Sequence, residues 1–152
     1  MSLALIGTLA APNLVAAVRA TLVEIVVPSN PYFGLMTLTG TVSQSVGPGT
    51  GTLGVTQFVL TNTGSSVAQV NLYAALLASG TCGGTNNVAA GTNPFLIVRV
   101  PAGETVVVPA PSPIVFAPQT GYDGNPHTCV AAGMPITGGS SNVYVSVNGF
   151  VN

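Results

Sequence analysis

The segment Asn142–Val151 reads NVYVSVNGFV, and its period of two decides the fold class. Val143, Val145 and Val147 fall on one face of an extended chain, while tyrosine, serine and asparagine alternate with them. One apolar face and one polar face are typical of an antiparallel strand that packs on a core on one side only. Gly149 interrupts the alternation, which predicts a β-bulge near the end of this strand.

Short β-branched runs separated by Gly, Pro and Asn recur along the rest of the chain. Leu53–Asn62 and Ser66–Leu77 flank the turn Asn62–Ser65, a pattern that predicts a β-hairpin. Before the first of these runs, Val46–Thr52 is rich in glycine and is expected to form a flexible loop. The other expected strands are Thr21–Val27, Leu35–Ser43, Phe95–Val100, Glu104–Val108, Ile114–Phe116 and Cys129–Ala132.

Helical periodicity is weak everywhere except at residues 13–20, where a turn or two of helix is expected. The sequence therefore predicts an all-β protein with a single antiparallel β-sandwich or jelly-roll-like domain. We place this domain at residues 21–152 and an apolar N-terminal arm at residues 1–20.

Charged residues make up only 3% of the chain, against about 25% in typical proteins. They are Arg19, Glu24, Arg99, Glu104 and Asp123, with a net charge of -1. Nucleic-acid phosphates require clustered Lys and Arg, and an anionic membrane surface requires a polybasic segment, so neither is an expected partner. So little charge gives a free monomer weak repulsion to keep it soluble. We expect both a surface hydrated by Thr, Ser, Asn and Gly and a homo-oligomer held by uncharged protein contacts.

The N-terminal segment is apolar, but Gly7, Thr8, Pro12 and Asn13 interrupt it. A spanning helix needs about 20 mostly apolar residues, so a membrane anchor is not expected. A secretory signal is disfavoured because no Lys or Arg precedes Arg19. We expect instead an assembly arm that contacts a neighbouring subunit through its apolar side chains. These are Leu3, Leu5, Ile6, Leu9, Leu14 and Val15.

The residues with catalytic or metal-binding chemistry are few. His127 is the only histidine and Asp123 the only aspartate, and both lie near Cys129. A hydrolase needs a nucleophile, a base and an orienting group that meet, and no Gly-x-Ser-x-Gly elbow occurs. Zinc sites usually show paired ligand spacings that this chain lacks. We therefore expect no catalytic residue, no metal and no cofactor, and hence no enzyme.

Cys82 and Cys129 are the only cysteines. A disulfide between them would close a long loop and would stabilise the fold by about 4 kcal/mol in the chain-entropy account. Sequence alone cannot place the two residues close together, so the disulfide and two partly buried free thiols remain equal alternatives.

Two smaller expectations concern side chains outside these groups. Arg99 and Glu104 flank the turn Pro101–Gly103 and could pair across a second hairpin, worth about 0–1 kcal/mol if exposed. The phenylalanines are expected in the core and the tyrosines at its rim, where the ring is dry and the hydroxyl wet.

Three runs and a terminal strand occur in a recognisable order. They are VTQFVLTNTGSSVAQVNLY (55–73), VPAGETVVV (100–108), PIVF (113–116) and VYVSVNG (143–149). This order resembles the small β-sandwich virion proteins of tailed bacteriophages. The resemblance covers residues 53–151, whereas residues 1–52 and the segments around the two cysteines depart from it.

The resemblance implies a structural virion protein, assembled in the host cytoplasm. Our leading interpretation is a capsid decoration or cement protein that binds neighbouring subunits of the major capsid protein. The resemblance also implies a homo-oligomer, in the first place a trimer, because trimers suit three-fold capsid positions. The alternatives are a tail or head-fibre module that binds host glycan, and a secreted bacterial surface or pilus-like subunit.

Overall fold

The computed structural model describes residues 30–74, 82–83, 93–121, 124–135 and 142–152. Within these ranges the chain forms strands and connections and no helix, so no described helix could cross a membrane. The strands are β1 (Pro31–Thr39), β2 (Gln44–Gly49), β3 (Leu53–Asn62), β4 (Ala68–Ala74), β5 (Leu96–Val100), β6 (Thr105–Phe116), β7 (Gln119–Thr120), β8 (Pro126–Gly133) and β9 (Asn142–Val151).

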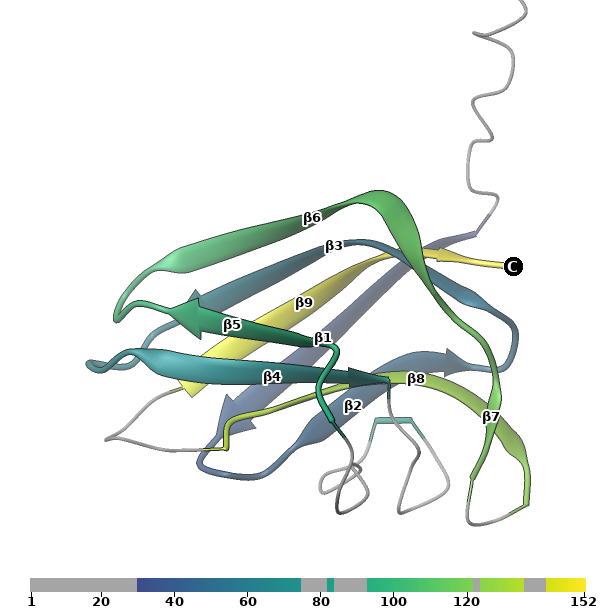
Figure 1. The fold of residues 1–152 in the computed structure, drawn as a ribbon, viewed down its shortest axis with the longest axis horizontal. Coiled ribbons are helices and arrows are strands. Elements are labelled where there is room, and N and C mark those ends of the chain that lie inside the picture. Colours follow the sequence, from purple (N-terminus) through teal and green to yellow (C-terminus); the bar gives the residue numbers. More distant parts are fainter. Residues whose placement is uncertain (1–29, 75–81, 84–92, 122–123, 136–141) are drawn as a thin grey trace, which may run out of the picture.

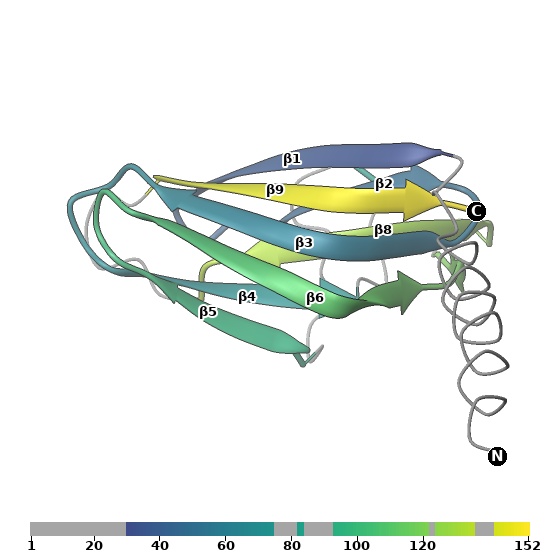
Figure 2. The ribbon, with the colours of Figure 1, turned by 90° about the horizontal axis from the view of Figure 1, so that it is seen from above.

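The strands form two antiparallel sheets that pack face to face (Figures 1 and 2). Sheet A has the order β1-β9-β3-β6, and sheet B has the order β2-β8-β4-β5, with the short β7 paired to β8. Consecutive strands β1 and β2, β3 and β4, and β5 and β6 lie in opposite sheets. This alternation between two four-stranded layers is the strand order of a jelly roll. The predicted all-β sandwich is therefore confirmed.

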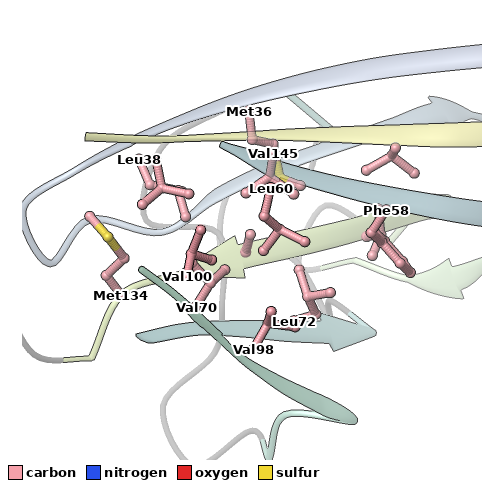
Figure 3. Packing of buried hydrophobic residues seen from close by; sticks show 14 of the residues in the cluster. Met36, Leu38, Phe58, Leu60, Val70, Leu72, Val98, Val100, Met134 and Val145 are labelled. Carbon is pink, nitrogen blue, oxygen red and sulfur yellow. The ribbon is translucent and has the colours of Figure 1, made fainter. Parts of the chain in front are cut away.

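Aliphatic side chains from both sheets fill the space between them (Figure 3). Leu60 and Val145 of sheet A lie above Val70 and Leu72 of sheet B, and all four are fully buried. Each such side chain stabilises the fold by about 1.5–3 kcal/mol relative to an exposed one. The predicted inner face of the last strand is confirmed, because its three alternating valines are completely buried.

The predicted hairpin at Asn62–Ser65 is wrong, because β3 belongs to sheet A and β4 to sheet B. The turn carries the chain across the sandwich instead of reversing it within one sheet. Pro101–Gly103 does the same between β5 and β6. The second hairpin, on which an Arg99–Glu104 pair would depend, is therefore wrong as well.

A single buried side chain stabilises both crossings. Asn62 is fully buried, and its Nδ2 donates hydrogen bonds to the carbonyls of Ser66 at 2.8 Å and Val100 at 3.0 Å. Its Oδ1 accepts a hydrogen bond from the Gly64 N–H at 2.9 Å. Its own N–H donates to the Glu104 carbonyl at 2.9 Å. Asn62 thus joins the end of β3, the start of β4 and the β5–β6 turn.

The prolines at 109, 111 and 113 do not end a strand, contrary to the expectation that Ile114–Phe116 forms a separate run. They lie within β6, which is an edge strand of sheet A. An edge strand tolerates proline because the missing N–H would have pointed to solvent. The register jumps here from Pro109 to Ile114 along β6, so the residues between them bow away from β3.

Two other local expectations differ from the structure. The Val46–Thr52 loop is wrong in part, because β2 extends to Gly49 with a register shift after Val46. The bulge predicted at Gly149 lies opposite that residue, but the extra residue is Thr56 on β3. The Thr56 hydroxyl donates to the Asn148 carbonyl at 3.2 Å, which satisfies one backbone acceptor beside the bulge.

Candidate functional site

The outer faces of the two sheets differ in what covers them. On sheet B, Ser45, Asn71, Cys129 and Ala131 are buried although they do not belong to the main core between the sheets. Cys82 packs on this face, and the neighbouring Gly83 N–H donates to the Ser45 hydroxyl at 3.3 Å. Cys82 and Gly83, which lie between β4 and β5 in the sequence, therefore cover part of this face.

A covalent bond holds Cys82 on the outer face of sheet B. Cys82 and Cys129 form a disulfide with a Cα–Cα distance of 5.7 Å, joining residues 47 apart in sequence. Of the two alternatives that the sequence leaves open, the structure therefore has the disulfide. Bonded sulfurs can serve neither as a nucleophile nor as thiolate metal ligands.

The loop chemistry considered from sequence does not converge on a site in the described chain. His127 lies on β8 beside the disulfide, and Asp123 lies outside the described residues. Among the residues that the structure describes, no group of three or more His, Cys, Asp or Glu could hold a metal ion.

No residue in the described part of the chain covers the outer face of sheet A in this way, and we call this surface the open face. The strand registers align its side chains in three rows that each cross all four strands. The rows are Phe33–Asn148–Gln57–Pro109, Leu35–Ser146–Val59–Val107 and Thr37–Tyr144–Thr61–Thr105. Large apolar groups on this face are well exposed: Phe33 is 66% exposed, Leu35 52% and Val107 50%. The expectation that phenylalanines fill the core is therefore wrong for Phe33.

The open face carries no charged side chain. Among the described residues only Arg99 and Glu104 are charged, and they lie on β5 and in the β5–β6 turn. The polar groups of the open face are hydroxyls and amides, and two of them already pair, since Thr61 Oγ1 lies 2.9 Å from Thr105 Oγ1. Tyr32 faces the other way and packs against the core between the sheets, where burial raises the pKa of its phenol, which therefore stays neutral. The uncharged open face loses little free energy when a partner removes its water.

The size of the open face limits what it can bind alone. Three rows spaced by two residues, across four strands about 4.8 Å apart, cover on the order of 400 Å². A stable protein interface buries about 800 Å² on each partner. The open face thus supplies roughly half of such an interface, and a stable complex needs a further contact.

The assembly-arm residues predicted from the sequence, Leu3, Leu5, Ile6, Leu9, Leu14 and Val15, lie outside the described residues. The open face was not apparent from the sequence. Alternation did place Tyr144, Ser146 and Asn148 outward, but the strands beside them were not predictable from local pattern.

Comparisons with known proteins give weak similarities. The sequence matches no protein-family profile and no curated protein. A structure of the infectious bursal disease virus Gx strain aligns with a TM-score of 0.28 and 17% identity, over 80% of this chain and 32% of that one. Infectious bursal virus derived T=1 particles align with a TM-score of 0.26 and 16% identity, over 80% and 32%. The chain spans about a third of these viral chains, and similarity this low assigns it to no family and no function.

Proposed function

We propose that this protein is a structural subunit of a virus particle, which acts by packing uncharged surfaces against other protein subunits. The observation that carries the proposal is the open face, an uncharged array of exposed apolar, hydroxyl and amide groups. Its support is chemical: interface cores are depleted of charge, and this face has none. The jelly roll is compatible, since viral capsid domains use it, but lectins and cupins use it too.

Within this role we propose that the protein decorates and stabilises a capsid. Homo-oligomers, in the first place trimers, would bind neighbouring subunits of the major capsid protein and remain part of the virion. The phage-protein resemblance of residues 53–151 and the low charge of the chain support this assignment. The arm at residues 1–20 would supply contact area that the open face lacks by itself. No catalytic step, nucleic acid or membrane is part of the proposal.

The test combines localisation with a pair of matched variants. Cryo-electron microscopy of particles purified from infected cells should locate the jelly roll on the capsid exterior, at contacts between subunits. Absence of the protein from purified particles would contradict the proposed role.

Val107→Asp places a carboxylate on the open face, and Ile97→Asp places one on the outer face of sheet B. The two residues are matched, because each lies on an edge strand and they are 50% and 54% exposed. We expect Val107→Asp to reduce incorporation at least tenfold, since burying an unpaired carboxylate is costly, and Ile97→Asp to incorporate normally. Equal incorporation would show that the open face is not the contact. Specific binding on a glycan array, with no capsid binding, would favour the tail or head-fibre alternative.

A further inference from the structure

Among the described strands, four lie at sheet edges, and three of these are protected against pairing with another strand. β6 carries prolines at 109, 111 and 113, and β2 contains Pro48 at its irregular end. β5 has only five residues, carries Arg99 and is followed by Pro101. Proline, charge and shortness are the usual devices that keep sheet edges from pairing. β1, by contrast, has nine residues, no charge and no proline after its first residue.

Hydrogen bonds fix which backbone groups of β1 face its free side. The Val151 N–H donates to the Asn30 carbonyl at 2.9 Å, so Asn30 faces β9. Because backbone groups point alternately to the two sides of a strand, Phe33, Leu35 and Thr37 face away from β9. The Thr37 N–H confirms this direction, since it donates to Gln44 Oε1 of β2 at 2.7 Å. The side chain of Gln44 thus caps one free donor of the edge.

Apart from Thr39, which ends the strand, the N–H groups of Phe33 and Leu35 are the donors of β1 that remain on this side, since Pro31 has none. No strand in the described part of the chain pairs with this side of β1. The side chains of the same two residues are the most exposed apolar groups of the open face on β1. A strand added here would therefore pair with the free backbone and extend the open face at once.

We propose that this edge binds residues 21–27 of a second copy of the protein as an added strand. The occupant is identified by its chemistry and its position in the chain. Residues 21–27 read TLVEIVV, a β-branched run without Gly or Pro and with one charge, which favours a strand. The segment ends three residues before Asn30, where the chain enters β1. Alternation leaves Glu24 on one face of such a strand and Val23 and Ile25 on the other.

The two prolines around the entry to β1 favour exchange between copies over pairing within one chain. A two-residue hairpin would put Pro28 at a position that needs positive φ, whereas proline fixes φ near −65°. A three-residue hairpin would need Asn30 in the left-handed region, but the residue before a proline is held extended. The same segment from a neighbouring copy meets neither restriction. This inference rests on the proposed function, because it supplies the contact between copies.

The test uses full-length variants blocked on one side of the exchange only. Leu35→Pro removes the free N–H of the acceptor edge without removing a bond to β9, and Ile25→Pro blocks the donor segment. For association between copies alone, and not for capsid binding by the open face, Val107→Pro is the matched control. The Glu104 carbonyl bonds towards β3, so alternation turns the Val107 N–H to the free side of β6. Leu35→Thr keeps the N–H and tests the side chain alone.

Sedimentation velocity at micromolar concentration gives the readout. We expect the wild-type protein and Val107→Pro to be oligomeric, and Leu35→Pro and Ile25→Pro each to sediment as monomers of 15.0 kDa. A mixture of the two blocked variants should form dimers of twice that mass, because one still has the donor and the other the acceptor. A mixture that stays monomeric overturns the exchange.

Amide hydrogen exchange of the wild-type protein decides the matter if Leu35→Pro fails to fold. Strand addition should slow exchange of the Phe33 and Leu35 amides by at least tenfold on going from monomer to oligomer, and unprotected amides in the oligomer overturn the inference. The two proposals fail separately. If the two blocked variants form dimers when mixed but purified particles lack the protein, only the proposed virion role is contradicted. If particles carry the protein but the Phe33 and Leu35 amides stay unprotected, only the proposed strand exchange is contradicted.

Discussion

The substitution Asn62→Asp tests whether one buried amide holds the two crossings of the sandwich together. The shape of the side chain is kept, but a carboxylate cannot donate to the carbonyls of Ser66 and Val100, which Nδ2 now binds at 2.8 and 3.0 Å. Each buried acceptor left without a partner costs about 1–3 kcal/mol. The bond to Val100 is buried and the bond to Ser66 partly buried, and together they give an expected loss of about 4 kcal/mol. This is a large part of the roughly 5–15 kcal/mol that stabilises a typical domain.

Urea unfolding followed by far-ultraviolet circular dichroism, with the disulfide kept oxidised, measures this loss. With a urea dependence of about 2 kcal/mol per molar, the midpoint should fall by about 2 M at pH 7. The matched control is Thr61→Ala, one residue away, which removes only the exposed hydrogen bond to Thr105 and should cost less than about 1 kcal/mol.

The loss in Asn62→Asp should also depend on pH. Burial raises the pKa of a carboxyl in the folded state above its unfolded value of about 3.9. The folded state therefore binds a proton more tightly, so the deficit is smallest below the unfolded pKa and grows as pH rises through the folded pKa. The protonated acid can donate one of the two lost bonds. A midpoint at pH 7 within about 0.5 M of wild type would refute the assignment of Asn62 as the residue that joins the crossings.

Three further outcomes are expected. Relative to the oxidised wild type, replacing both Cys82 and Cys129 by serine should cost about 4 kcal/mol in urea unfolding, because the bond closes a loop of 47 residues. Non-reducing peptide mapping of particles released from cells should find the wild-type pair linked, and a fully reduced pair in such particles would contradict this. Association should change little from low to molar sodium chloride and strengthen in sulfate, since few charges are available to screen; release in step with rising salt would reveal an ionic contact. Deleting residues 1–20 should leave a folded domain that no longer decorates particles, and normal decoration by the deletion would rule out the arm.

The sequence predicted which side chains of a strand face the core better than it predicted which strands pair with one another. Alternation reports which side chains of a strand point inward, so the buried valines of β9 and the buried Val70 and Leu72 of β4 were predictable. The turn at Asn62–Ser65 was recognisable too, but turn residues do not determine which sheet the next strand joins. That depends on pairing between distant segments, such as β3 with β9, which no local pattern reveals.

The open face was unpredictable for the same reason. Its central row brings together Leu35, Val59, Val107 and Ser146, which become neighbours only through strand order. The prolines of β6 led to the wrong prediction of a separate strand at Ile114–Phe116, because proline normally ends a strand. A sheet edge tolerates proline, but the sequence does not show that β6 lies at an edge.

For a protein in the proposed role, the disulfide on sheet B implies that assembly and disulfide formation occur at different times. Reducing conditions in a host cytoplasm keep thiols reduced, so the subunit would fold and assemble there with Cys82 and Cys129 as free thiols. Their bond would then form when the finished particle reaches oxidising surroundings, after its shape has been set by packing alone. Oxidation would act as a maturation step, which makes each subunit harder to unfold outside the cell than at the moment of its assembly.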